Sequence, residues 1–190
     1  MTKMTELIDF INNFQELDTE TEEAIRGFFK KEVYKKNEFI LEEGKICSKI
    51  SFIKSGLVRR FYINEGKDIT EWIYFDNQWL TSTASFIHQK PSLEYLQACE
   101  ATVLYSLSYS DEQKLLEYPL FAKFYIKLLR NFLASFNEFR HTYNLMSTQE
   151  KYKFLLCNFP EIIQRGKLKH VASMLDISQE TLSRIRSSIY

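Results

Sequence analysis

The chain has 190 residues, of which 45% are hydrophobic and 15% aromatic; this is ample for packed cores and excludes an intrinsically disordered protein. Basic and acidic residues number 25 each, so the formal net charge is zero and any nucleic-acid-binding surface has to be local. Three cysteines without CxxC spacing argue against a disulfide framework or a thiolate metal site. No apolar run approaches the roughly twenty residues of a membrane span, so we expect a soluble cytoplasmic protein.

The first segments of the chain have helical spacing. Apolar residues recur three and four apart over Met4–Phe14 and again over Asp18–Phe29. The second segment opens on Asp18 or Thr19 and has acidic residues in its first turn, as helix starts do. Two N-terminal helices are therefore predicted.

From Glu32 to about Ser108 the apolar period changes to two. Short aromatic and β-branched runs alternate with turn formers such as Glu43-Gly44-Lys45 and Ser55-Gly56, at a spacing of about ten residues. This rhythm predicts an antiparallel sandwich or barrel of the jelly-roll kind, and the whole chain as an α+β fold. The predicted strands are Glu38–Leu41, Ser51–Ile53, Leu57–Ile63, Ile69–Phe75, Tyr95–Ala98 and Thr102–Leu107.

A long helix is predicted from Pro119 to about Leu145, after a shorter one that starts at Tyr109 and ends before Pro119. It carries one apolar seam and a second line made of Leu129, Leu133 and Phe136, so we expect it to cover the barrel on one side and a partner helix on the other. Its length of about 40 Å exceeds what a small barrel needs, which favours a two-fold dimer contact over a purely intrachain core helix. The residues assigned to the dimer seam are Phe121, Tyr125, Leu128, Phe132 and Phe139.

The C-terminal residues are typical of a helix-turn-helix. A helix over Glu150–Phe159 and a link over Pro160–Gly166 lead to two short helices within Lys167–Tyr190, the second capped by Ser178. From Ser147 onward seven basic residues stand against four acidic ones, a local charge of +3 that suits DNA. The predicted domains are a sensor barrel with N-terminal helices (1–118), a dimerisation helix (119–146) and a DNA-binding domain (147–190).

This order of parts resembles the Crp/Fnr family of bacterial transcription regulators. The resemblance rests on Gly44 and Gly56 bracketing the strand Ile50–Ile53, on the segment Ile177–Arg184, and on the layout around Pro119, and it looks most like Bacteroidetes-type members. It implies a cyclic-nucleotide-binding-like barrel and a homodimeric DNA-binding transcription regulator, not an enzyme. Its implied partners are double-stranded DNA, RNA polymerase if the protein is an activator, and a small-molecule effector of unknown identity.

The resemblance also implies which residues meet DNA, and side-chain chemistry agrees with it. Arg184 suits a guanine O6/N7 pair, Glu180 a cytosine amine and Gln179 adenine, although the family commonly has arginine where Gln179 stands. Asp176 stands where a turn glycine is usual, and Asp tolerates the left-handed turn geometry. The residues expected at phosphates, where they fix register without reading sequence, are Lys169, His170, Ser178, Thr181, Ser183 and Arg186.

The sensor region departs from the family pattern. Cyclic-nucleotide-binding members have a Gly-Glu pair and an arginine where this chain has Leu80-Thr81 and Ser92, so we expect no useful affinity for cyclic AMP unless Lys90 or Arg59 compensates. We expect no cofactor and no metal. The neutral lining that could take an uncharged ligand, or none, comprises Trp79, Thr81, Ser82, Thr83, Ser85, Tyr95 and Gln97.

Two other functions stay open at this point. One is a ligand-binding or protein-interaction module whose terminal hairpin does not read DNA. The other is a cupin-like metalloenzyme on the same barrel, which would need several histidines or carboxylates to converge, whereas His88 alone of the three histidines lies in the barrel region.

Overall fold

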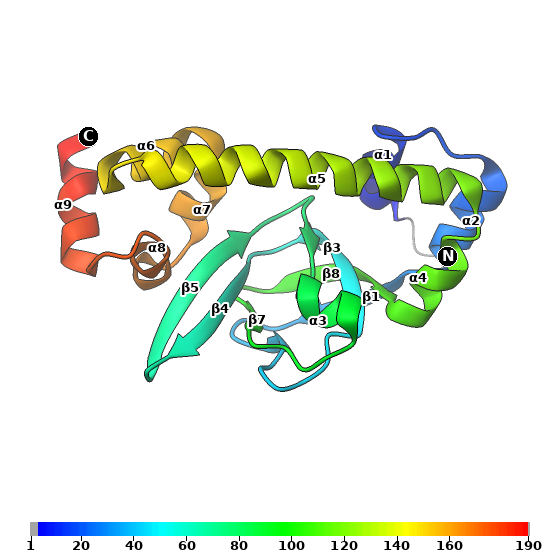
Figure 1. Cartoon of the computed structure of the whole chain (residues 1–190), viewed down its shortest axis with the longest axis horizontal. Helices are drawn as coiled ribbons and strands as arrows, with labels where there is room; N and C mark the ends of the chain where they lie inside the picture. Colours follow the sequence, from blue (N-terminus) through cyan, green and yellow to red (C-terminus); the bar gives the residue numbers. More distant parts are fainter. Residues whose placement is uncertain (1–3, 190) are drawn as a thin grey trace.

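The computed structural model describes residues 4–189, and its first two helices are the predicted ones. They are α1 (Thr5–Asn12) and α2 (Thr19–Phe28), and Asp18 caps α2 by accepting a hydrogen bond from the Thr21 amide at 2.8 Å. Figure 1 shows both helices with α4 (Tyr109–Leu115) at the end of the molecule where the long helix α5 (Pro119–Leu145) begins. The predicted bounds of α5 are confirmed.

The strands form two four-stranded antiparallel sheets rather than one closed barrel. The sheet orders are β1-β8-β3-β6 and β2-β7-β4-β5. A short helix, α3 (Thr83–His88), joins the two sheets, and neither it nor β1 and β6 was predicted. The strands are β1 (Lys30–Tyr34), β2 (Phe39–Leu41), β3 (Lys49–Ser55), β4 (Val58–Asn64), β5 (Lys67–Tyr74), β6 (Trp79–Leu80), β7 (Tyr95–Ala98) and β8 (Thr102–Ser108).

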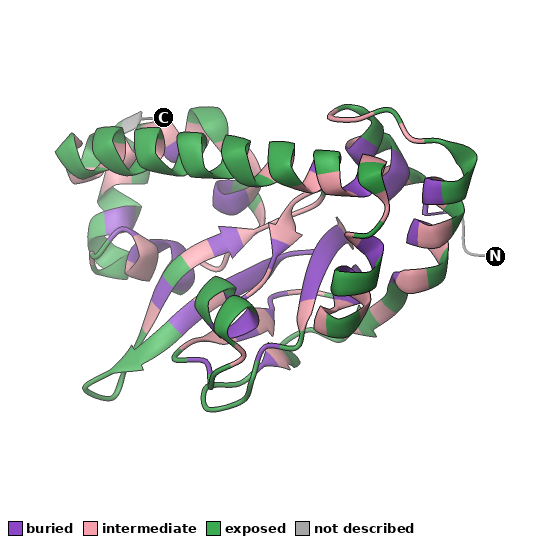
Figure 2. Cartoon of the chain, turned by 45° about the vertical axis from the view of Figure 1, so that its right-hand side comes forward, coloured by how far each residue is buried: buried purple, intermediate pink, exposed green. Residues whose placement is uncertain are grey.

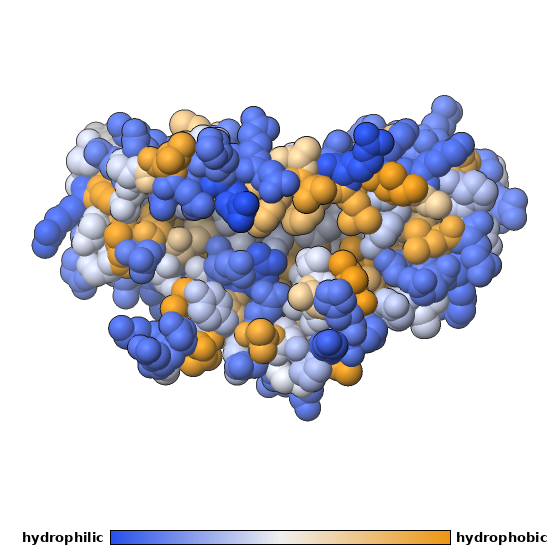
Figure 3. All heavy atoms as spheres, viewed as in Figure 1, coloured by the Kyte–Doolittle hydropathy of each residue, from blue (hydrophilic) through white to orange (hydrophobic). Residues whose placement is uncertain are grey.

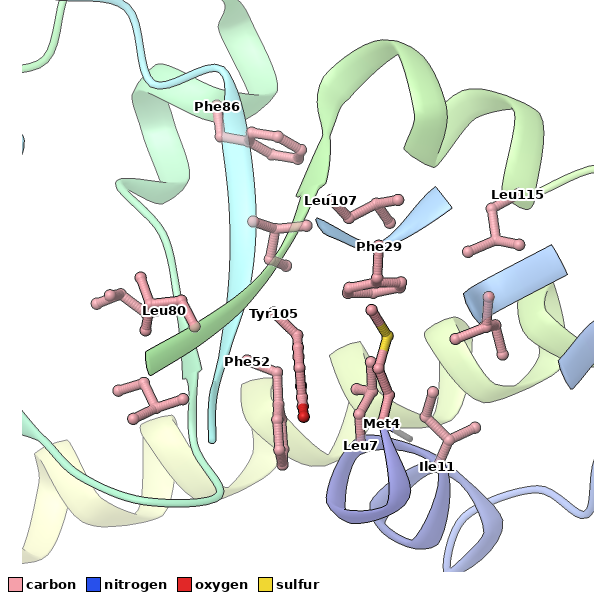
Figure 4. Packing of buried hydrophobic residues seen from close by; sticks show 14 of the residues in the cluster. Met4, Leu7, Ile11, Phe29, Phe52, Leu80, Phe86, Tyr105, Leu107 and Leu115 are labelled. Atoms are coloured by element: carbon pink, nitrogen blue, oxygen red, sulfur yellow. The ribbon is translucent and has the colours of Figure 1, made fainter. Parts of the chain in front are cut away.

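The main hydrophobic core joins the sandwich to α1 and to the start of α5. Phe52 and Tyr105, paired across β3 and β8, are fully buried, and Figure 4 shows both with Leu7 and Ile11 of α1. Close packing also explains Gly56, whose φ is +127° and where a Cβ would lie 2.4 Å from the Thr102 hydroxyl. The N-terminal helices therefore belong to the same body as the sandwich.

Within the described residues, four helices follow α5. They are α6 (Thr148–Asn158), α7 (Pro160–Arg165), α8 (Leu168–Met174) and α9 (Gln179–Ile189), so the predicted link over 160–166 is largely a helical turn. These helices share a second core with the sandwich, in which Leu57, Ile73 and Cys99 pack with residues of α6 to α9. The C-terminal helices therefore pack against the sandwich as well as being connected to α5. None of the helices within residues 4–189 is long and apolar enough to cross a membrane.

Candidate nucleic-acid interface

The turn between α8 and α9 is a Schellman motif. The Ile177 amide donates to the Ala172 carbonyl at 3.0 Å, and the Asp176 amide donates to the Ser173 carbonyl at 3.0 Å. Asp176 has a φ of 55°, the left-handed conformation that this motif requires. The turn therefore ends α8 sharply and fixes the angle at which the chain enters α9.

The start of α9 is held by Ser178, as predicted. The Ser178 hydroxyl accepts from the Thr181 amide at 3.1 Å and lies 3.2 Å from the Thr181 hydroxyl. The Ser178 hydroxyl and the amide at Glu180 lower the pKa of the Glu180 carboxyl, which is therefore an anion at neutral pH. Ser178 and Thr181 remain exposed, but both are engaged in the cap and not simply available to phosphates.

The outer face of α9 carries the predicted base-reading side chains. Leu182 is buried at 1% exposure and fixes the inner face, whereas the polar residues turned away from it are exposed. A shallow open concavity runs along this outer face. Ser187 and Ser188 belong to it and were not predicted, although Ser187 lies one helical turn beyond Ser183. The residues that line it are Leu168, Gln179, Glu180, Ser183, Arg184, Ser187 and Ser188.

The predicted phosphate contacts other than Ser178 and Thr181 separate into two groups. Lys169, Ser183 and Arg186 are exposed. His170 was assigned wrongly: it is only 5% exposed, and its Nδ1 lies 3.1 Å from Nη1 of Arg59 in β4. The side chain faces the sandwich because α8 packs its His170 side against the strands, a contact that the local sequence does not reveal.

The predicted dimer seam on α5 is mostly an intrachain seam. Phe121 is fully buried, and Tyr125 and Leu128 pack against the main core. Phe139 packs on Trp72 of β5 with ring centroids 5.3 Å apart. Of the predicted seam only Phe132 is well exposed, at 58%.

The second apolar line of α5 is the exposed one. Figure 2 shows α5 exposed over most of its length, and Figure 3 shows hydrophobic side chains gathered near its middle. Exposed fractions along this face run from 46% at Phe136 to 62% at Leu133. We name the set the α5 apolar face; it consists of Ile126, Leu129, Phe132, Leu133 and Phe136.

The residues predicted to line an effector pocket do not come together. Trp79 packs in the main core, 5.6 Å from Phe52 between ring centroids, and Tyr95 stacks on Phe61 at 4.8 Å. Gln97 accepts from Arg59 Nε at 3.0 Å and donates to the Asn37 carbonyl at 2.8 Å.

The hydroxyls of that predicted lining are used locally. Ser82 and Ser92 bond to each other at 3.1 Å, Ser85 accepts from the Cys47 amide at 2.8 Å, and Thr81 donates to the Lys49 carbonyl at 3.0 Å, while Thr83 is exposed at the start of α3. These groups therefore hold loops in place and leave no shared polar lining.

A cavity between the two sheets is small. Its volume is about 70 Å³, far below the roughly 300 Å³ or more of typical ligand sites. None of the predicted lining residues borders it. It is lined by Ile40, Leu41, Ile46, Cys47, Ser48, Lys49, Ser51, Leu80 and Leu96.

A cation that sequence reasoning missed lies on the inner face of the second sheet. Arg60 is opposite Leu96 of β7, a main-core residue, and its Nε lies 3.0 Å from Glu71 and 3.5 Å from Glu94. Arg59, its neighbour, points to the opposite face because side chains alternate along a strand. Two carboxylates thus already neutralise the inner arginine. Within residues 4–189 no three histidine, cysteine or acidic side chains gather in a way that could hold a metal ion.

Comparisons with known proteins agree with the fold described above. Residues 31–118 match the Cyclic nucleotide-binding domain family. No curated protein matches the chain by sequence. The catabolite activator protein of Thermus thermophilus has 18% identity and a TM-score of 0.58, over 93% of this chain and 85% of that one.

Two further solved structures are similar. The c-di-GMP-responsive global regulator CLP of Xanthomonas campestris has 14% identity and a TM-score of 0.64, over 90% of this chain and 91% of that one. FixK2 of Bradyrhizobium japonicum has 14% identity and a TM-score of 0.69, over 85% of this chain and 84% of that one. The family match ends at residue 118, so the structural likeness extends beyond it into the C-terminal helices. Residues 31–118 are thus similar to a cyclic nucleotide-binding domain, and the fold of the chain is similar to the folds of these three solved structures.

Proposed function

We propose that the chain is a homodimeric, sequence-specific DNA-binding transcription regulator of the Crp/Fnr type. The observation that carries the proposal is the outer face of α9. Gln179, Glu180 and Arg184 are exposed side by side on a helix whose entry is fixed by the Asp176 turn and the Ser178 cap. A helix held in this way, with polar side chains free at its N-terminal half, suits the major groove.

The proposed contacts divide between bases and backbone. Arg184 has the bidentate geometry for guanine, and the Glu180 anion can accept from a cytosine amine. Lys169, Ser183 and Arg186 are exposed on the same helix pair and would meet phosphates. Because the chain's net charge is zero, the cations Lys169 and Arg186 would have to supply the electrostatic attraction to the DNA backbone.

The proposed dimer forms through the α5 apolar face. Monomeric proteins rarely expose five large apolar side chains on one helix, and a two-fold contact between two copies of α5 would bury all of them. The two α9 helices would then stand on the same side of the dimer. A two-fold symmetric operator with half-sites about 34 Å apart, one DNA turn, is the expected target.

In this proposal the sandwich is not a receptor for cyclic AMP. The cavity of about 70 Å³ is too small for a nucleotide, and Arg60, the cation on the inner face of the sheet, is paired with Glu71 and Glu94. An effector, if the protein uses one, would be small and uncharged.

Selection of binding sites from random duplex DNA tests the proposal. The purified 190-residue chain should enrich a two-fold symmetric motif, and Arg184→Ala should lose the preference at one base pair of each half-site. Lys45→Ala is the matched control, because it removes one positive charge from an exposed loop of the sandwich far from α9 in the sequence. Enrichment of no motif by the unaltered chain, or the same motif from Arg184→Ala, would contradict the proposal.

A further inference from the structure

A buried polar cluster joins α8 to the sandwich. We call it the Arg59 junction; Arg59 is its centre, only 5% exposed. Arg59 donates to both carboxylate oxygens of Asp68, at 2.6 and 2.7 Å. The remaining members are Thr70 on β5 and His170 and Ser173 on α8.

His170 closes the junction from the helix side. Its Nδ1 lies 3.1 Å from Arg59 Nη1, and a guanidinium has only hydrogen-bond donors, so Nδ1 must be the acceptor and His170 must be neutral with its proton on Nε2. Burial and the positive charge of Arg59 lower the pKa of His170 to about 4. The neutral form is therefore the one that fits the junction at physiological pH.

Ser173 adds a contact one helical turn away. Its hydroxyl accepts from the Thr70 backbone amide at 2.9 Å and donates to the Asp68 carbonyl at 3.3 Å. The backbone of β5 is thus bonded directly to α8. Sliding or rotating α8 would leave a buried amide and a buried guanidinium N–H without partners, which is costly.

These hydrogen bonds restrict the orientation of α8 more closely than the shared apolar core does. Burial of Val171, Ala172 and Leu175 holds α8 on the sandwich but tolerates small rotations, whereas hydrogen bonds to Arg59 and Thr70 fix one orientation. The turn at Asp176 carries that orientation on to α9. Arg59, 111 residues before His170 in the chain, therefore helps to define where α9 points relative to α5.

We propose that Arg59 is a positioning residue for DNA recognition, which acts through His170 to set the half-site spacing that the dimer accepts. This inference rests on the proposed function. When α8 and α9 are fixed to the sandwich, the dimer binds half-sites at one spacing without losing further conformational entropy. When they are not fixed, it can bind several spacings, but each binding event costs conformational entropy. Arg59 itself need not touch DNA.

The test compares spacing preference in two variants of the same residue. His170→Phe keeps a planar ring but removes the acceptor for Arg59, and His170→Asn keeps an acceptor near the position of Nδ1. Each variant of the 190-residue chain, and the unaltered chain, is titrated with operators whose half-sites are moved apart or together by single base pairs. In the unaltered chain one spacing should bind best.

In His170→Phe we expect the ratio of affinities between the best and the shifted operators to fall by about tenfold, the effect of losing one hydrogen bond to a charged group. His170→Asn should restore most of that ratio. Equal weakening at every spacing would mean a merely structural role, and tighter binding at the best spacing would mean that the junction opposes DNA binding; either result overturns the inference.

A second measurement needs no DNA. Amide hydrogen exchange in His170→Phe should become faster in α8 and α9 while the strands of the first sheet keep their protection, because only the helix pair is released. Unchanged exchange in α8 would overturn the inference. If the unaltered chain shows normal protection but binds no duplex DNA, the proposed function fails instead.

Discussion

Arg165 of α7 donates from Nη1 to Oδ2 of Asp76 at 2.6 Å, which ties the C-terminal helices to the loop that follows β5. The other oxygen of Asp76 accepts from the Gly56 amide at 2.6 Å, and Nη2 of Arg165 donates to Glu100 at 2.6 Å. One side chain of α7 thus bonds two loops of the sandwich directly and a third, that of Gly56, through Asp76. This contact is independent of the Arg59 junction.

Arg165→Ala should lower the free energy of unfolding by about 1–2 kcal/mol, because two partly buried carboxylates lose a charged donor. Urea unfolding followed by circular dichroism measures the change. Lys153→Ala, on the exposed side of α6, is the control and should change stability much less. Equal stability of the two variants would show that the Asp76 and Glu100 contacts are exchanged for water without cost.

Phe132→Glu should convert the proposed dimer to a monomer, since it places a charge in the middle of the α5 apolar face. Analytical ultracentrifugation measures the change. Asn131→Glu introduces the same charge at an exposed position that points away from that face, and it should leave the dimer intact.

Phe121→Ala distinguishes the role of the buried apolar line of α5 from that of the exposed one. Phe121 is fully buried against its own chain, so the substitution should cost about 3–5 kcal/mol of stability and leave the association state of the folded protein unchanged. A Phe132→Glu protein that sediments as a dimer would remove the α5 apolar face from the interface.

The two apolar lines also show what the sequence could predict and what it could not. Pro119 and the periodic pattern gave the bounds of α5 correctly. Which line faces the sandwich depends on the rotation of the helix, and that is set by partners such as Trp72 of β5. Two equally apolar lines on one helix carry no local signal of which is buried.

Other differences have similar causes. β1 has the sequence Lys30-Lys31-Glu32-Val33-Tyr34 and is an edge strand, paired with β8. Charged residues are common on edge strands, and here they hide the apolar pattern by which a strand is recognised in the sequence. The turn at Asp176 and the cap at Ser178 are local, and both were predicted. The burial of His170 depends on a strand far away in the chain, which is why it was assigned to DNA.

Stability should fall in mild acid because of His170. Its pKa is about 4 in the folded protein against an ordinary value of 6.5 for histidine, because burial disfavours the charged form and Arg59, Lys169 and Lys167 outweigh the opposing charge of Asp68. Between these values the unfolded chain binds a proton that the folded chain does not, so stability is lost as pH falls from about 6.5 towards 4.

The loss from this one group should reach up to about 3 kcal/mol near pH 4. Carboxylates titrate in the same range, so the quantity to compare is the difference between the unaltered chain and His170→Asn in urea unfolding at pH 7 and at pH 4.5. The difference should move in favour of His170→Asn on acidification. A difference that does not change with pH would contradict the buried neutral state.

Lys169→Ala should weaken DNA binding without changing which sequence is preferred. Lys169 is exposed on α8, and loss of one phosphate contact in each subunit of the proposed dimer should reduce the slope of log affinity against log salt by about 2. Arg184→Ala should instead lower operator affinity by about 1–3 kcal/mol for each half-site and relax one base position in each half-site. Identical salt slopes for the unaltered chain and Lys169→Ala would remove Lys169 from the interface.

Cyclic AMP should not stabilise the protein. A ligand of the folded state present at about 100 times its Kd adds about 2.7 kcal/mol and raises Tm by several degrees. We expect no shift beyond that of sodium chloride at equal ionic strength, because the cavity between the sheets is about 70 Å³ and Arg60 already has Glu71 and Glu94 beside it. A saturable rise in Tm would mean that the sheets separate around the nucleotide and that Arg60 exchanges its carboxylates for the phosphate.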